Sequence, residues 1–165
     1  MQRAQRLGLN ITIHAGEIAG AVNVLQALND YGATRIGHGY RLLEDVEALK
    51  EIIRRGVHLE CCPTSSLETG GWTGPSSEKE DWTSHPIALL LKAGVVNLGL
   101  NSDDPQVFDT SITAEFAIAR KKIGLSEEQI YACNLASIDA AFVDEEEKER
   151  LRLEFARRRI QQSSI

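Results

Sequence analysis

The sequence predicts an α/β domain built on a parallel sheet, and three observations support this fold class. Four short segments with strand character alternate with segments whose apolar residues recur at helical spacing. Such alternation implies parallel strands joined by right-handed crossovers. The unusual polar residues follow directly after the strand segments, at the edge where parallel α/β folds carry their active sites. A length of 165 residues is enough for one domain with a buried core.

The predicted strands are short, and their side chains alternate between two faces. In the first, Thr12 and His14 share a face, and in the last, Leu98 and Leu100 share the face opposite Asn97. Polar residues facing inward and apolar ones facing helices are what a small parallel barrel needs near its mouth. The four segments are 11–13, 34–36, 57–61 and 95–100.

Helices are predicted between and after these strands, and residues 1–7 resemble the tail of another helix. Three polar residues are predicted as N-caps: Ser84, Ser126 and Asp144, the last two in capping boxes. The stretch 63–84 is the only long irregular segment, in which Trp72 and Trp82 are expected either to close a lid or to pack. His85 is expected at a loop or helix start. The predicted helices are 18–28, 43–54, 84–92, 112–122, 126–138 and 144–159.

Composition excludes several classes of function. The net charge is −6 and no basic stripe is interleaved with aromatic residues, so a nucleic-acid partner is not expected. No apolar run approaches a membrane span, and no signal-peptide core follows the first residues. Three cysteines without a CxxC pair form neither a disulfide framework nor a zinc knuckle, which predicts a reducing, cytoplasmic setting.

Five polar residues near the strand ends are of the types found in the active sites of metal-dependent hydrolases: His14, Glu17, His38, Asp103 and Asp104. Imidazole and carboxylate bind Zn²⁺, while a second histidine and a glutamate can move protons near neutral pH. Each residue alone also has a structural interpretation: a core or surface histidine, a first-turn glutamate, or a solvated Asp-Asp-Pro turn. The sequence contains no serine-nucleophile elbow, phosphate-binding loop or dinucleotide-binding fingerprint that would indicate another class of enzyme.

Four motifs in this order resemble the C-terminal half of the adenosine deaminase family, from about residue 8 to 158. They are His14-Ala15-Gly16-Glu17, Arg35-Ile36-Gly37-His38-Gly39, Glu60-Cys61-Cys62-Pro63-Thr64-Ser65-Ser66 and Leu100-Asn101-Ser102-Asp103-Asp104-Pro105. The resemblance implies that residues 1–165 are a single domain comprising the second half, about four βα units, of a (β/α)₈ barrel.

The resemblance also implies an activity, which is zinc-dependent hydrolysis of adenosine or deoxyadenosine to the inosine and ammonia. By similarity, His14 and Asp103 are zinc ligands, one Zn²⁺ serving each complete site. The resemblance further implies that Glu17 transfers a proton at purine N1, and that His38 orients and deprotonates the attacking water. Asp104, at purine N7, and Gly16 are implied to contact the substrate. The segments 64–66 and 70–72 favour adenosine, with adenine, AMP or a modified adenosine as alternatives.

The sequence departs from the family in one large respect. The family carries a His-x-His pair after its first strand, whereas the four histidines here include no such pair. We expect a chain without the N-terminal half of the barrel, truncated or from an incomplete gene model. Two ligands should bind zinc poorly, and open barrel edges should promote self-association, so we expect the isolated chain to be inactive. A non-catalytic binding or regulatory half-barrel is the remaining alternative.

Overall fold

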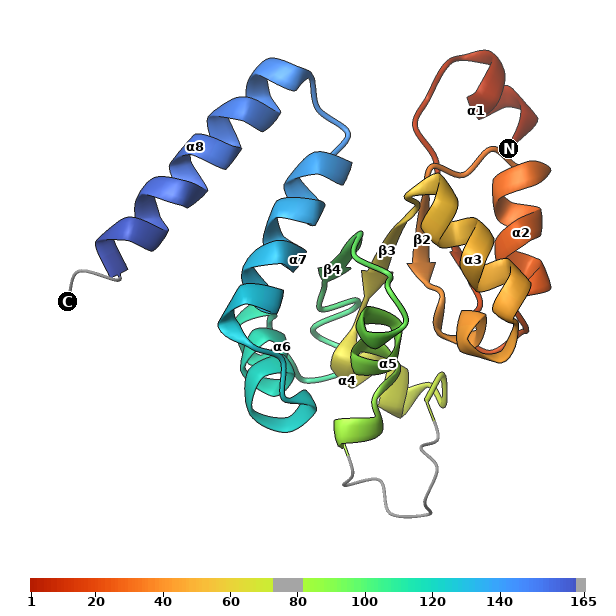
Figure 1. Cartoon of the computed structure of the whole chain (residues 1–165). Helices are drawn as coiled ribbons and strands as arrows, with labels where there is room; N and C mark the ends of the chain where they lie inside the picture. The colour runs from red at the N-terminus through yellow and green to blue at the C-terminus, as the bar shows by residue number, and fades with distance from the viewer. Residues whose placement is uncertain (73–81, 163–165) are drawn as a thin grey trace.

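The structure is a computed structural model that describes residues 1–72 and 82–162. Its strands form one parallel sheet in the order β1-β2-β3-β4. Figure 1 shows β2, β3 and β4 next to one another. In this ladder His14 pairs with Gly37, and Glu60 pairs with Gly99. The strands are β1 (Thr12–Ala15), β2 (Arg35–His38), β3 (His58–Cys61) and β4 (Leu98–Leu100). This architecture confirms the predicted α/β class with four consecutive parallel strands.

Helices follow each strand. In Figure 1, α2 and α3 lie beside β1 and β2, α7 runs alongside β4, and α8 projects away from the rest. The helical elements are α1 (Gln2–Arg6), α2 (Val22–Asn29), the 3₁₀ turn η1 (Tyr40–Glu44), α3 (Val46–Arg55), α4 (Pro63–Glu68), the 3₁₀ turn η2 (Trp82–Ser84), α5 (Pro86–Lys92), α6 (Ile112–Ile118), its π-helical continuation η3 (Ala119–Ile123), α7 (Glu127–Ala140) and α8 (Glu145–Gln162).

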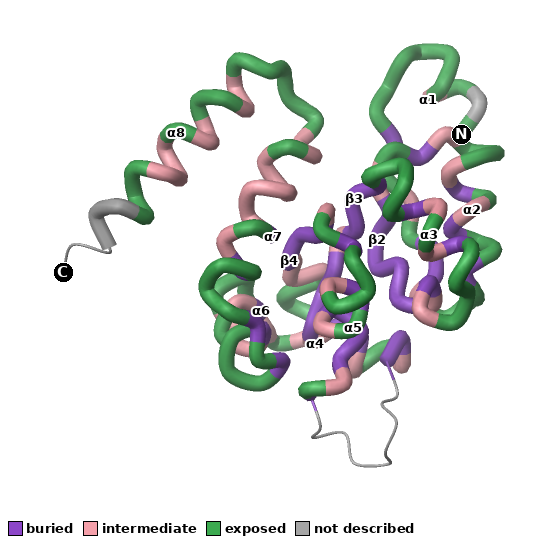
Figure 2. Tube along the Cα trace, in the orientation of Figure 1, coloured by how far each residue is buried: buried purple, intermediate pink, exposed green. Residues whose placement is uncertain are grey.

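The sheet has one apolar and one polar face, as the alternation predicted. Ile36, Leu59 and Leu98 are fully buried on the apolar face. Figure 2 shows most of β2 and β3 in the colour of buried residues. On the other face, Arg35 Nε lies 2.8 Å from Glu60 Oε1, and the Thr12 hydroxyl donates to Glu60 Oε2 at 2.7 Å. The polar face is therefore held together by charge and hydrogen bonds.

Three predicted elements have different boundaries. The segment 63–84, predicted as irregular, opens with α4 because Pro63 occupies the first helical turn, where its fixed φ is favourable. The helix predicted from residue 18 begins only at Val22, after Gly20, a residue with poor helix propensity. The last strand pairs only over Leu98–Leu100. The predicted irregular residues 73–81 lie outside the described residues.

The helix caps confirm two of the three predicted N-caps and correct the third. Ser126 and Gln129 form the predicted capping box at the start of α7. At α5, however, His85 rather than Ser84 is the N-cap, and its Nδ1 accepts from the Ile87 amide at 3.2 Å. Pro86 determines which residue is the N-cap. Proline is favoured at the first residue of a helix, so the N-cap of α5 is the residue just before Pro86, which is His85. Asp144 caps α8 by accepting from the Glu147 amide at 2.9 Å.

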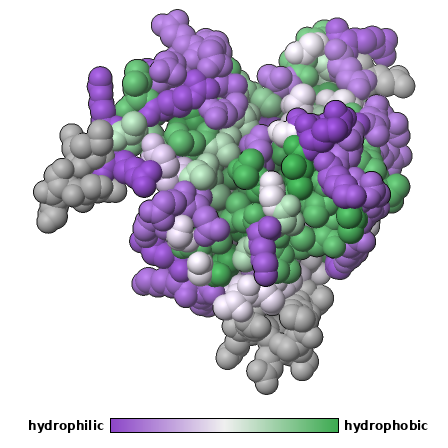
Figure 3. Space-filling model, viewed as in Figure 1, coloured by the Kyte–Doolittle hydropathy of each residue, from purple (hydrophilic) through white to green (hydrophobic). Residues whose placement is uncertain are grey.

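Hydrophobic and hydrophilic residues occupy different parts of the surface. Figure 3 shows hydrophobic residues gathered over the middle of the visible face, around α5, and hydrophilic ones along α8. Among the described residues, no helix has both the length and the apolar character needed to cross a bilayer.

Candidate functional site

A cavity of about 380 Å³ opens at the carboxyl edge of the sheet. It is lined by residues at or just after the carboxyl ends of all four strands, because parallel strands bring these ends to the same edge. The lining consists of His14, Gly37, His38, Glu60, Cys62, Asn101, Ser102, Asp103 and Ile112. Three of the predicted site residues, His14, His38 and Asp103, therefore meet around one cavity.

His38 ends β2 and lies at the centre of this site. Its backbone has a φ of 70°, which is unusual for a residue other than glycine, and its side chain is 2 % exposed. Nε2 lies 3.5 Å from Glu17 Oε2 and 3.8 Å from Asp103 Oδ2, while Nδ1 has no hydrogen-bond partner among the described residues. Burial lowers the pKa of His38 in spite of the opposing effect of Glu17, so the ring is neutral near pH 7.

The Glu17 carboxylate lies between His38 and the segment that follows β3. Its Oε1 accepts a hydrogen bond of 2.6 Å from the Thr69 hydroxyl. Its backbone carbonyl accepts from Arg41 Nε at 3.2 Å. Both ends of the residue are therefore fixed, and the carboxylate lies beside His38.

Asp103 also has a left-handed backbone, with a φ of 54°. The Ser65 hydroxyl donates to its Oδ2 at 2.6 Å, which orients the carboxylate toward His38. Asp104 is exposed at the next position, and its backbone carbonyl accepts from the amides of Val107 and Phe108. The two adjacent carboxylates therefore occupy different environments.

Two glycines allow the backbone and side chains to approach closely here. A Cβ on Gly37 would lie 2.4 Å from Cδ2 of His14, so the His14 ring can lie against β2 only because residue 37 has no side chain. The rings of His14 and His38 meet edge to face at 4.8 Å. Gly16 has a φ of 67°, and a Cβ there would lie 2.6 Å from Val24. Gly16 is buried, so its side-chain-free turn shapes the wall behind Glu17.

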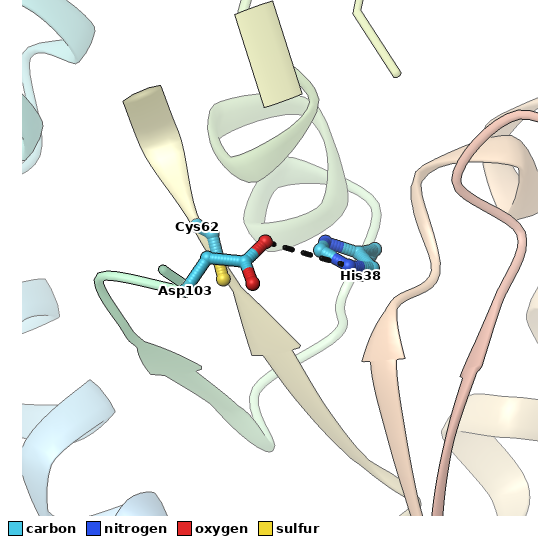
Figure 4. Close-up of side chains that lie close together, drawn as sticks. All are labelled: His38, Cys62 and Asp103. Atoms are coloured by element: carbon cyan, nitrogen blue, oxygen red, sulfur yellow. Dashed lines mark ion pairs between the residues drawn. The ribbon is translucent and has the colours of Figure 1, made fainter. Parts of the chain in front are cut away.

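Three residues bring potential metal ligands together: His38, Cys62 and Asp103. Their ligand atoms lie within 4.8 Å of one another, and Figure 4 shows them converging from three strand ends. Nitrogen, thiol sulfur and carboxylate oxygen are donors that suit a zinc-type ion, so the residues present fit such a metal. His14 lines the same cavity but is outside this group of three. Burial raises the pKa of Cys62 far above its usual range, so without a metal the side chain is a thiol.

Several residues that support the site were not predicted. Ser65 and Thr69 hydrogen-bond to Asp103 and Glu17 from α4 and the residue after it. Glu115 is fully buried and accepts from the Thr64 amide at 2.9 Å and from the Thr110 hydroxyl. The Tyr40 hydroxyl donates to the Cys62 carbonyl and accepts from the Cys62 amide at 2.8 Å. In the sequence, only the serine- and threonine-rich composition of residues 63–84 indicated that Ser65 and Thr69 could have a role.

His85 anchors the end of the long segment beneath the site. The ring is fully buried, stacks on Trp82 and lies 4.7 Å from the Trp72 ring, so both tryptophans pack in the interior. Its Nε2 lies 2.7 Å from the Ser66 hydroxyl, and Nδ1 accepts from Ile87, which assigns the proton to Nε2. Burial lowers the pKa of His85 to about 3.

Comparison with known proteins matches nearly the whole chain to one family. The family model described as adenosine deaminase matches residues 1–157. An adenine deaminase of Rhizobium leguminosarum is 41% identical over 148 residues, covering 90% of this chain and 44% of that protein. An adenosine deaminase of Aliivibrio fischeri is 37% identical over 150 residues, covering 91% and 43%.

The solved structures extend the agreement to the fold. An amidohydrolase of Burkholderia ambifaria, solved with bound Zn, superposes with a TM-score of 0.85 at 25% identity, covering 95% of this chain and 42% of that one. This coverage agrees with the expected half of a (β/α)₈ barrel. The chain spans less than half the length of the relatives it matches. With the family model covering nearly all of its residues, the chain belongs to the adenosine deaminase family.

Proposed function

We propose that this chain supplies part of the active site of a metal-dependent deaminase that hydrolyses the 6-amino group of a purine nucleoside or base. The observation that carries the proposal is that the carboxylates of Glu17 and Asp103 both lie within 3.8 Å of the buried His38 ring. His38 and Asp103 also line the cavity at the carboxyl edge of the sheet. Family membership supports the reaction class. Three buried free cysteines are consistent with a cytoplasmic setting.

In this proposal the roles follow the chemistry of each group. His14 and Asp103 would hold a zinc ion, which would supply a Lewis acid that lowers the pKa of water to near neutral. His38 is kept neutral by burial, so it can orient the attacking water and accept its proton. Glu17, fixed by Thr69, transfers a proton at purine N1.

Asp104 and Gly16 are proposed to contact the purine. Asp104 is exposed, and its carboxyl group in the protonated form can donate a hydrogen bond to a ring nitrogen such as N7. The role of Gly16 rests on the resemblance, and its tight turn, packed against Val24, sets the course of the chain into Glu17. Adenosine and deoxyadenosine are the first candidate substrates, on the resemblance of 64–66 and 70–72. Adenine is the second candidate, because the Rhizobium protein of higher identity is an adenine deaminase.

An ultraviolet assay of adenosine and adenine conversion tests the proposal. The purified chain would be assayed with added Zn²⁺, alone and together with a separate polypeptide carrying the part of a relative that precedes the matched region. Glu17→Gln is the matched control, because it keeps the shape and removes the transferable proton. We expect deamination that depends on Glu17 in the mixture. Equal activity in wild type and Glu17→Gln, or none in either preparation, contradicts the proposal.

A further inference from the structure

The sheet carries a second cavity, of about 370 Å³, at the edge opposite the proposed catalytic site. Its lining includes residues that lie just before the four strands, namely Asn10, Thr34, Gly56 and Asn97, and the connection 140–143 between α7 and α8. In Figure 1 this connection lies at the other end of the sheet from α4, which follows β3. We call this space the amino-edge cavity, and its volume is within the range of small-molecule sites.

The amino-edge cavity differs from the proposed catalytic cavity in the sign of its charged residues. Arg35 and Lys148 line it, and no aspartate or glutamate of the described residues does, whereas Glu60 and Asp103 line the catalytic cavity. The chain as a whole has a net charge of −6, so a cavity lined by two cations is a local exception. Such a lining favours an anion as the ligand.

The Arg35 guanidinium is held in place but retains unused hydrogen-bond donors. Its Cζ lies 3.6 Å from the centroid of the Phe142 ring, and its Nη1 donates to the Ala140 carbonyl at 3.1 Å. Nε is 2.8 Å from Glu60 Oε1, yet it is buried and is not aligned for a hydrogen bond. Nη2 donates to none of the described residues. A fixed guanidinium with free N–H groups is well suited to bind a phosphate oxygen.

Lys148 approaches the same cavity from α8. Its Nζ donates to the Asp139 carbonyl at 2.7 Å, and within the described part of the chain no carboxylate lies within 4.0 Å of it. The Asp139 carboxylate pairs instead with Arg152, at 2.7 Å. An ammonium group has three donors, so Lys148 keeps two of them, and its positive charge, for a ligand.

We propose that the amino-edge cavity binds a phosphate group, free or as a phosphomonoester, through the side chains of Arg35 and Lys148. Two cations match the charge of a phosphate dianion, and no carboxylate of the described lining opposes it. His58 adds no charge to the cavity, because burial lowers its pKa and its Nδ1 donates to Asn97 Oδ1 at 2.6 Å. The two charged side chains therefore carry the binding.

One ion pair connects the amino-edge cavity with the proposed catalytic cavity. Arg35 lines the first and Glu60 lines the second, and their side chains are 2.8 Å apart. A phosphate that binds the guanidinium competes with Glu60 for its charge, so the ligand is a regulatory one rather than a substrate. Phosphate binding does not require deamination, so this proposal and the proposed function can fail separately.

Calorimetry with inorganic phosphate tests the proposal on the metal-free 165-residue chain. The titration uses a phosphate-free buffer of low ionic strength, in which charged groups are least screened. We expect one phosphate per chain, and Lys148→Gln should weaken binding about tenfold because a charge-assisted hydrogen bond is lost. Lys50→Gln is the matched control, because it removes the same charge from α3, outside the cavity, and should leave the affinity nearly unchanged. No binding, or equal weakening by both substitutions, overturns the proposal.

Amide NMR spectra of the wild-type chain locate the ligand even if a variant fails to fold. Phosphate should shift the signals of residues 34–35 and 140–143 most strongly, and shifts that are largest at His14, His38 and Asp103 would overturn the proposal. Ribose 5-phosphate then distinguishes the two sources of the phosphate group. Tighter binding of the ester at the same amides indicates a phosphomonoester, and equal or weaker binding indicates the free ion.

Discussion

The hydroxyl of Thr69 lies 2.6 Å from Oε1 of Glu17, although 52 residues separate them. The same hydroxyl is 2.9 Å from the Ser65 carbonyl, so one short side chain links the proposed proton-transfer group to α4. Ser65 in turn holds Asp103. The two carboxylates beside His38 are thus oriented by neighbouring turns of one segment.

Replacing Thr69 tests this link. We expect Thr69→Val to lower the turnover of deamination by about 10- to 100-fold with little change in KM, because a misplaced carboxylate slows the chemistry more than binding. Thr69→Ser retains the hydroxyl and should restore most of the rate. The measurement is kcat and KM in the two-polypeptide assay. A loss that Thr69→Ser fails to rescue argues for a packing role instead.

Glu115 is expected to contribute to stability from the interior. Glu115→Ala leaves the Thr64 amide without its acceptor and should reduce the free energy of unfolding by about 2–3 kcal/mol. Glu115→Gln retains an acceptor and should cost less. Urea denaturation followed by circular dichroism measures both. Equal stability of Glu115→Ala and wild type would show that the contact does not stabilise the fold.

The lowered pKa of His85 predicts that the free energy of unfolding decreases in mild acid. Its pKa is about 3 when folded and about 6.5 when unfolded, so between these values the unfolded chain binds the proton more readily. The stabilisation is fully present above pH 6.5 and is lost as the pH falls toward 3, by up to about 1.4 kcal/mol per pH unit. His38 and His58, whose pKa values burial also lowers, act in the same direction.

Urea denaturation at a series of pH values checks this dependence. The interval from about pH 5 to 7 avoids most carboxyl titration. His85→Gln, which cannot titrate, should flatten the slope and leave only the part due to His38 and His58. An unchanged slope in His85→Gln would assign the effect to other groups.

Gly37→Ala should disturb His14 specifically. The added methyl group would lie 2.4 Å from the His14 ring, so the ring must move at a cost of about 1–3 kcal/mol. Gly20→Ala is the matched control, because nothing lies within 4 Å of its Cβ position. The histidine ring signals in NMR spectra and urea denaturation report the two effects. Undisturbed His14 signals in Gly37→Ala would contradict the close contact.

The 165-residue chain is expected to self-associate. Several large apolar side chains are mostly exposed, among them Val22, Val96 and Val107, and β1 has a neighbouring strand on one side only in the described sheet. Size-exclusion chromatography with light scattering should give a mass above 18.2 kDa that rises with concentration. A single species at the monomer mass across that range would count against it.

The sequence was most informative where a chemically functional side chain lies next to a recognisable strand pattern. His14, His38 and Asp103 each follow a recognisable strand, so their meeting at one edge could be predicted from topology alone. Ser65, Thr69 and Glu115 could not be assigned in this way, because their roles depend on contacts between distant segments. The cap at His85 shows a local limit, since Pro86 rather than the preference for serine decided where α5 begins.

The strand order β1-β2-β3-β4 follows the order of synthesis. Each strand leaving the ribosome therefore finds its neighbour already made, and the ladder can lengthen in one direction without waiting for a later segment. Asp103 comes after the last of these strands, so it is synthesised after the two histidines and Glu17. During translation the pocket would remain open on that side until the final strand docks, and a nascent chain halted before β4 would have no completed cavity.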